Sequence, residues 1–133
     1  MTSSSQSLAA RIESLAPWFY DFELPGGVRT APNIPRSRRA VHDTRLRMLD
    51  DLFAREPDLA HGSAIDVGCH EGLYGLALRR SGFTHVVGAD VRRVNVEKAR
   101  FITEAFGHAD PEFHVLDAEE LDRALELEPQ LLG

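Results

Sequence analysis

The chain has 133 residues, of which 43% are hydrophobic and 27% charged, and its formal net charge is −6. This composition indicates a globular domain and excludes collagen-like and disordered chains, while the acidic balance argues against DNA as a partner. No apolar stretch approaches the ~20 residues that span a bilayer, and Met1–Ser7 lacks the pattern of a signal peptide. The single cysteine, Cys69, excludes an internal disulfide. We therefore expect a cytoplasmic protein without a membrane partner.

The first part of the chain predicts a helix and a hairpin. We expect a disordered, serine-rich tail over residues 1–7 and a short helix over Leu8–Ala16. Trp18–Leu24 is aromatic and partly alternating, and a Pro-Gly-Gly turn separates it from Val28–Thr30. Because glycine adopts positive φ without steric cost, this pattern indicates strand, tight turn and strand.

A longer helix is predicted from about Ser37 to Glu56, where apolar residues recur at helical spacing. Five arginines lie between Arg36 and Arg47, against one acid, Asp43. This basic stripe could contact a phosphate-bearing substrate, or it could be the solvent-exposed face of the helix.

The remaining sequence alternates between strand and helix patterns. Short β-branched runs predict strands, and a longer segment that reads as helical follows each of them. The strands are Ala64–Val67, Thr84–Ala89 and Glu112–Leu116; the helices are Gly72–Arg80, Val94–Phe106 and Ala118–Leu127. This order predicts an α/β fold with a Rossmann-like parallel sheet and right-handed crossovers.

A glycine-rich loop, Asp66-Val-Gly-Cys-His-Glu-Gly72, joins the first strand to its helix. Ligands of open parallel sheets bind at the carboxyl ends of the strands. Gly68 and Gly72 let the backbone turn sharply and approach a ligand closely. The following helix points its free amides into the same space, where they would stabilise a carboxylate.

Two further acids are predicted at the same edge. Asp90 follows the second strand, where a carboxylate can accept both hydroxyls of a ribose. Asp117 follows the third strand, where it could accept a hydrogen bond from an adenine amine. One glycine loop alone would be weak evidence, but three strand ends in this order form a specific pattern.

These segments resemble the motifs of class I S-adenosylmethionine-dependent methyltransferases. Residues 64–72 resemble the first motif, Val86–Asp90 the following acidic motif, and His114–Ala118 the motif that contacts adenine. The resemblance covers about residues 60–120. More loosely, the Trp18–Thr30 hairpin, the arginine-bearing helix and the phrase Gly-Cys-His-Glu-Gly resemble methyltransferases related to the tRNA wobble-uridine group.

The resemblance implies a role for each site residue. The methionine pocket would be shaped by Asp66, Gly68, Cys69 and Gly72. Asp90 would hold the ribose, and Asp117 with the amide of Ala118 would read the adenine edge. One position departs from the commonest motif, because its middle glycine is His70 here, which bears on loop geometry or affinity.

Other classes of site are less compatible with the same loop. A nicotinamide site requires G-x-G-x-x-G, and a P-loop requires Gly-Lys followed by Ser or Thr; neither is present. Cys69, His70 and Glu71 are metal-ligand types, but three consecutive residues rarely converge on one ion, so we expect no metal. Cys69 as a nucleophile would need an activating base, which the sequence does not assign.

The domain is expected to be partial. Residues 8–57 would hold the N-terminal helix, hairpin and helix, and residues 58–133 the N-terminal half of a cofactor-binding Rossmann-like domain. A fourth strand would begin just after Gln130. The first strand of such a sheet is normally paired on both sides, but one side of Ala64–Val67 would stay unpaired here. An unpaired apolar edge is prone to association, and a homodimer or a complementing chain would cover it.

The resemblance implies methyl transfer from S-adenosylmethionine by direct displacement, to a small-molecule or RNA acceptor. No catalytic residue is assigned, and His42, His85 and His114 are candidate bases by residue type alone. The alternative is a non-catalytic cofactor-binding or interaction module, a truncated fragment that needs a partner chain to complete its sheet.

Overall fold

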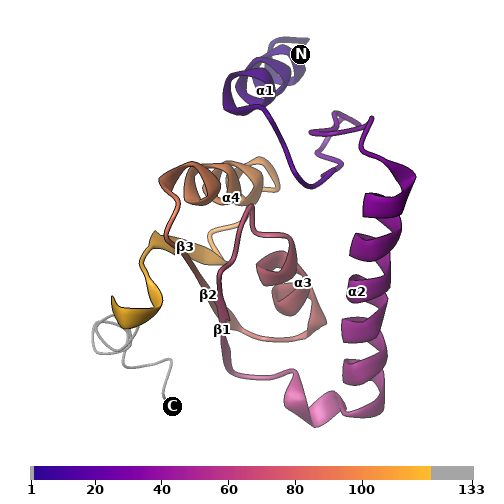
Figure 1. Ribbon diagram of the computed structural model, residues 1–133, viewed down its shortest axis with the longest axis vertical. Helices are drawn as coiled ribbons and strands as arrows, with labels where there is room; N and C mark the ends of the chain where they lie inside the picture. Colours follow the sequence, from indigo (N-terminus) through magenta and orange to yellow (C-terminus); the bar gives the residue numbers. More distant parts are fainter. Residues whose placement is uncertain (1, 121–133) are drawn as a thin grey trace.

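A computed structural model describes residues 2–120 of the chain (Figure 1). Three parallel strands form one sheet in the order β1-β2-β3. They are β1 (Ser63–Val67), β2 (His85–Asp90) and β3 (Glu112–Val115). Ser63 pairs with His85, and Val87 pairs with Glu112. The predicted α/β fold with a partial Rossmann-like sheet is therefore confirmed.

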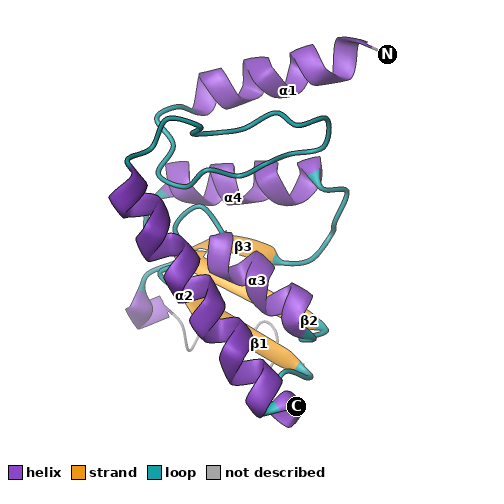
Figure 2. Cartoon of the chain, turned by 90° about the vertical axis from the view of Figure 1, so that its right-hand side faces the viewer, coloured by secondary structure: helices purple, strands orange, loops and turns teal. Residues whose placement is uncertain are grey.

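The helices between the strands make the crossovers that parallel pairing requires. Helix α3 (Leu73–Ser81) packs on β1 and β2, and α4 (Arg93–Ala105) packs on β2 and β3. Helix α2 (Arg36–Arg55) lies against α3, so that both stand in front of the strands in Figure 2. A 3-10 turn, η1 (Pro57–Leu59), connects α2 to the sheet.

Helix α1 (Thr2–Leu15) packs on α4 at the upper end of the molecule (Figures 1 and 2). The sequence predicts a tail over residues 1–7, but α1 includes residues 2–7. Leu8, Ile12 and Leu15 belong to the main core, and serine costs a helix little. A helix that is anchored at this apolar face therefore extends into the serine-rich segment.

The predicted hairpin has its turn but not its two strands. Gly27 N–H donates to the Leu24 carbonyl across the turn, 3.0 Å, and a single antiparallel bridge joins Glu23 to Arg29. Leu24 N–H donates to the Val28 carbonyl and Thr30 N–H to the Phe22 carbonyl, but Phe22 N–H donates to Thr30 Oγ1, 2.8 Å, so backbone and side-chain acceptors are mixed. Backbone groups that are satisfied in this way leave no regular ladder.

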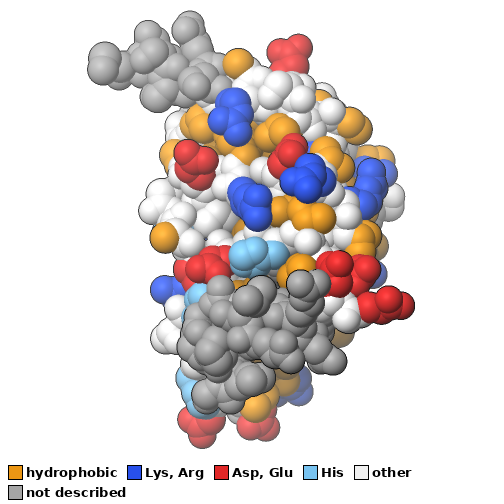
Figure 3. Space-filling view, turned by 90° about the vertical axis from the view of Figure 1, so that its left-hand side faces the viewer, with side chains coloured by type: hydrophobic (Ala, Val, Ile, Leu, Met, Phe, Trp, Pro, Cys, Tyr) orange, Lys and Arg blue, Asp and Glu red, His pale blue; other side chains and the backbone are white. Residues whose placement is uncertain are grey.

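Two apolar clusters form the core. The larger joins the N-terminal region to α3 and α4, and includes Trp18, Phe22, Leu24, Leu76 and Ile102. The smaller lies under the glycine loop and consists of Cys69, Val96, Ala99 and Phe113, with Val115 packed against it. The face seen in Figure 3 carries acidic and basic side chains intermingled, without a field of one sign.

A last turn, η2 (Ala118–Glu120), follows β3. The helix predicted over Ala118–Leu127 coincides with η2 at its first three residues. Its remainder, and the fourth strand expected after Gln130, lie outside the described residues. Across residues 2–120, none of the helices combines the length and the hydrophobicity of a membrane span.

Candidate cofactor site

The glycine loop leaves the carboxyl end of β1 and is fixed to the end of β2. The N–H groups of Gly68 and Cys69 both donate to the Ala89 carbonyl, 2.8 and 2.9 Å. Gly72 N–H donates to the Cys69 carbonyl, 3.0 Å, which closes a tight turn. The backbone has positive φ at Gly68 (74°), His70 (52°) and Gly72 (95°).

The two flanking glycines face different surroundings. A Cβ on Gly72 would lie 3.0 Å from Ala99 Cβ and 3.0 Å from Phe113 Cζ, so this glycine lets the loop rest on the core. A Cβ on Gly68 would meet no described atom within 4 Å. The loop is therefore packed from below at Gly72 and open at Gly68.

Asp90 ends β2 and holds the loop through its carboxylate. Its Oδ2 accepts the His70 N–H, 2.9 Å, and its Oδ1 accepts the Arg92 N–H, 2.8 Å. The Asn95 amide reaches Oδ1 at 3.4 Å. Charged acceptors make strong hydrogen bonds, so Asp90 stabilises the positive φ of His70, the one non-glycine residue described with that conformation.

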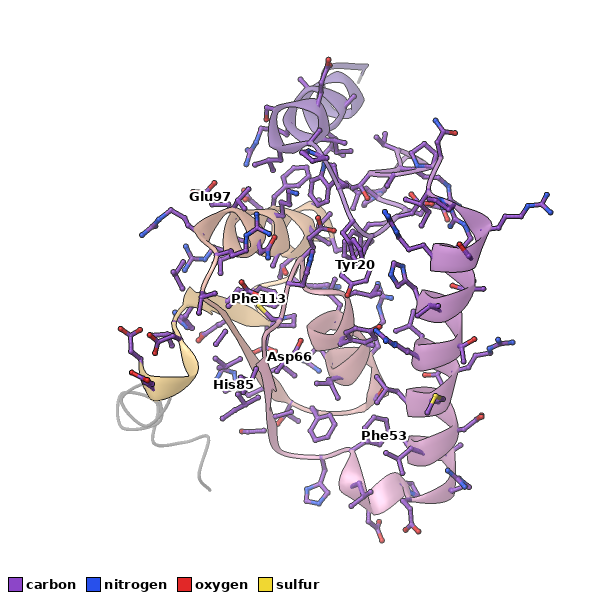
Figure 4. The ribbon with its side chains drawn as sticks, viewed as in Figure 1. Tyr20, Phe53, Asp66, His85, Glu97 and Phe113 are labelled. Carbon is purple, nitrogen blue, oxygen red and sulfur yellow. The ribbon has the colours of Figure 1, made fainter. Side chains whose placement is uncertain are left out.

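Asp66 lies inside β1, below the loop, as Figure 4 shows. Its Oδ2 is buried and has no hydrogen-bond partner among the described residues. Burial, and secondarily the charge of Asp90, raises the pKa of Asp66 to about 6, against the opposing effect of the Gly75 amide. Desolvation disfavours an anion without a partner. The Oδ2 atom of Asp66 therefore lacks a hydrogen-bond donor among the described residues.

Cys69 is 1% exposed, and burial raises its pKa to about 12. A raised thiol pKa disfavours the thiolate form that a nucleophile or a metal ligand requires. The described residues contain no group of three metal-ligating side chains.

The end of β3 lies beside the end of β2. Leu116 N–H donates to the Asp90 carbonyl, 3.0 Å, which brings the two strand ends together. Asp117 is exposed at the start of η2, where its Oδ1 accepts the Glu120 N–H, 2.9 Å, and Ala118 is the first residue of that turn. Asp66 thus lies within β1, Asp90 at the end of β2 and Asp117 just after β3. The binding roles of these three acids stay predictions.

A buried ion pair lies beside the loop and was not predicted from the sequence. Glu71 is 0% exposed, and its Oε2 lies 3.2 Å from Nζ of Lys98 in α4. The same carboxylate accepts the N–H groups of Phe19 and Tyr20, at 2.9 Å and 2.8 Å. We call residues 17–20 the strap, because Glu71 fastens them across the loop. Composition offered one signal, since Lys98 is the chain's single lysine.

The strap places aromatic rings against His70. The ring centroid of His70 lies 5.0 Å from that of Phe19 and 5.3 Å from that of Tyr20, and Figure 4 shows Tyr20 above α3, between α4 and α2. His42 of α2 lies 4.5 Å from Tyr20. Burial, followed by the charges of Arg38 and Arg45, lowers the pKa of His42. This shift favours the neutral form of the His42 imidazole within this cluster.

The other two histidines nominated as bases lie elsewhere. His85 begins β2, at the opposite end from the loop, with Nδ1 2.7 Å from Asp110 Oδ2. His114 lies within β3, and its Nε2 is 3.7 Å from a carboxylate oxygen of Glu112. Among the three, His42 alone contacts the strap.

Part of the predicted basic stripe is used within the fold. Arg39 of α2 pairs with Asp21, 2.9 Å, and Arg38 stacks over the Phe19 ring at 4.9 Å. These contacts tie α2 to the N-terminal segment. They account for two arginines of the stripe without a phosphate-bearing substrate.

A hollow of about 380 Å³ lies between the strap, the loop and the start of α4. Its walls include Phe19, His70, Glu71, Arg92 and Asn95. A second hollow, of about 580 Å³, lies between α2 and α3 beside Asp66 and has a mostly apolar lining. The first adjoins the His70 amide that Asp90 holds.

Comparison with known proteins finds likeness in structure. No protein-family model and no curated protein matches the chain. The N-terminal domain of EvdMO1, solved with SAH bound, is 26% identical with a TM-score of 0.69, over 92% of this chain and 50% of that chain. EvdMO1 itself is 27% identical with a TM-score of 0.66, over 91% of this chain and 26% of that chain.

A second solved protein has a similar fold. WbdD, a bifunctional kinase-methyltransferase, is 23% identical with a TM-score of 0.59, over 88% of this chain and 26% of that chain. The chain spans half the length of the EvdMO1 N-terminal domain it matches. It is structurally similar to S-adenosylmethionine-dependent methyltransferase domains.

Proposed function

We propose that this chain is the cofactor-binding part of an S-adenosylmethionine-dependent methyltransferase. One observation carries the proposal: Asp90 holds the open loop at the carboxyl ends of β1 and β2, 2.9 Å from the His70 amide. The chain also has 26% sequence identity, and a similar fold, to a domain solved with SAH bound. SAH is S-adenosylmethionine without its transferable methyl group.

The residues present fit this cofactor. Gly68 leaves open space beside the loop where a side chain would stand. Asp66 offers a buried carboxylate oxygen without a partner among the described residues. With Cys69 and Gly72, these residues would shape the methionine pocket. Asp90 would hold the ribose, and Asp117 with the Ala118 amide would hold adenine.

The bound cofactor would supply a methyl group already activated as a sulfonium. The chain's own residues then have two tasks, to orient the cofactor and to exclude water. The loop amides and Asp90 orient it, and the strap rings over His70 limit solvent access. The acceptor we propose is a small molecule or an RNA, and no base is assigned.

Calorimetric titration with SAH and with S-adenosylmethionine tests the proposal. Asp90→Ala removes a charged acceptor and loosens the His70 amide, so affinity should fall by about 10- to 100-fold. Asp58→Ala, an exposed acid of η1, is the matched control and should bind as the parent does. Failure of the parent chain to bind either molecule, or unchanged binding by a folded Asp90→Ala, contradicts the proposal.

A non-catalytic module is the second candidate. Within the described residues β1 pairs only with β2, which leaves its other edge open, and Val67 is 54% exposed. A complementing chain or a second copy would cover this edge. Transfer of a labelled methyl group to RNA or to a small-molecule pool by the chain alone would rule out this candidate.

A further inference from the structure

Lys98 is the chain's only lysine beside fourteen arginines, and it is 5% exposed. Burial of an ammonium group is costly unless it is paired and hydrogen-bonded. Glu71 supplies the pairing charge and is itself 0% exposed. The pair therefore occupies a site built around two opposite charges rather than a surface contact.

Together, the contacts of this pair connect three parts of the chain. The Lys98 ammonium donates to Glu71 and to the Pro17 carbonyl, and it lies 5.2 Å from the centroid of the Trp18 ring. Glu71 in turn accepts the Phe19 and Tyr20 amides. Loop, helix α4 and strap thus meet at one carboxylate and one ammonium.

The strap depends on this pair for its backbone hydrogen bonds. Three of its polar groups, the Pro17 carbonyl and the amides of Phe19 and Tyr20, are satisfied by Lys98 or Glu71. If one partner is removed, the other becomes an uncompensated buried charge. Opening the strap to water is the direct way to relieve it.

The fastened strap acts on the proposed cofactor loop. Phe19 and Tyr20 place their rings against His70, whose amide Asp90 holds. Residues of the strap also form one wall of the 380 Å³ hollow beside the loop. A released strap would remove that wall and free the His70 ring.

We propose that Glu71 and Lys98 are positioning residues that clamp the strap over the cofactor loop and thereby slow cofactor release. The inference rests on the proposed function, because it assigns the strap to the same site. We expect the pair to affect the dissociation rate of the cofactor more than its association rate, because a closed strap hinders a bound cofactor from leaving.

The first experiment measures strap opening in the chain without ligand. Hydrogen exchange at the Phe19 and Tyr20 amides should accelerate about 100-fold in Lys98→Met, with β2 amides little changed. The double variant Glu71→Gln with Lys98→Met leaves no buried charge and keeps a carbonyl acceptor, so its exchange should return toward that of the parent. Glu97→Gln, on the exposed face of α4, is the control.

The second experiment measures SAH kinetics by stopped flow. Lys98→Met should dissociate SAH about tenfold faster, with an association rate within about twofold of the parent. Acetylation of the Lys98 amine by an N-hydroxysuccinimide ester, mapped by mass spectrometry, should slow when SAH is bound.

Two results overturn the inference, and a third belongs to the proposed function. Equal exchange at Phe19 and Tyr20 in Lys98→Met and the parent would show that the pair does not clamp the strap. Open-strap exchange with an unchanged SAH dissociation rate would show that the strap does not retain the cofactor. Absence of SAH binding by the parent contradicts the proposed function, while the exchange data still decide whether the clamp exists.

Discussion

The underside of the glycine loop and the strap above it are held by different forces. Below, the Phe113 ring is packed against glycines: a Cβ on Gly75 would lie 3.2 Å from it, and one on Gly88 2.5 Å. Above, the strap depends on hydrogen bonds to Glu71 and Lys98. Close packing of carbon atoms holds the underside of the loop, and hydrogen bonds to two charged side chains hold the strap above it.

The two glycines of the loop differ in how closely the core packs against them. Gly72 is required by the core below it, because its Cβ would meet Ala99 and Phe113 at 3.0 Å. Gly68 has no such neighbour among the described residues. Packing against the core therefore requires a glycine at position 72 but not at position 68.

Removing the ring below the loop should have the largest effect. Phe113 is 2% exposed, and Phe113→Ala should lower the free energy of unfolding by ~4 kcal/mol through lost transfer energy and a cavity. Urea denaturation measures this change. Leu59→Ala removes a side chain that is 54% exposed and should cost less than ~0.5 kcal/mol. A loss below ~1 kcal/mol for Phe113→Ala would show that the layer under the loop is not tightly packed.

A smaller effect is expected from the buried acid of β1, and it depends on pH. The pKa of Asp66 is raised from 3.8 to about 6, so the folded state retains a proton that the unfolded chain releases. Its stabilising contribution is complete below about pH 4 and is lost as pH rises through about 6. Asp66→Asn should therefore gain up to ~2 kcal/mol over the parent between pH 4 and pH 7.

Thermal or urea unfolding across that pH range measures the Asp66 effect. The exposed acid Asp58 provides the control substitution Asp58→Asn, whose difference from the parent should not follow this curve. A difference for Asp66→Asn that is flat between pH 4 and pH 7 would contradict the raised pKa.

The smallest effect concerns the segment just after the strap. Thr30 Oγ1 donates to the Tyr20 carbonyl, 2.7 Å, and accepts the Phe22 N–H, 2.8 Å. Thr30→Val keeps the shape and leaves both backbone groups unpaired, at a cost of ~1–2 kcal/mol. Thr44→Val, at an exposed position of α2, is the control in the same denaturation assay. If the two variants are equally stable, the hydroxyl contributes nothing to this segment.

The sheet and its loop were predictable because their signals are local. The strands at residues 64–67 and 84–89, and the helix beginning near Val94, show in runs of four to thirteen residues. The structure shifts their boundaries by a residue or so. Glycine likewise permits the positive φ that the backbone has at Gly68 and Gly72.

The strap was not predictable, because its partners are distant in sequence. Phe19 and Glu71 are 52 positions apart, and Pro17 and Lys98 are 81 apart. The aromatic run Trp18–Leu24 predicts a strand, but Glu71 accepts the amides of Phe19 and Tyr20 instead. Only the topology of the sheet brings these acceptors within reach.

These sequence separations also bear on the order in which the chain folds. The strand pairs join residues that are 22 and 25 positions apart in register, whereas the strap contacts close loops of 52 and 81 positions. Longer loops lose more chain entropy on closure, so contacts across them form late. We expect the parallel sheet and its glycine loop to assemble first, before the strap covers the loop. The N-terminal segment would then dock as the last step, on a surface that is already native.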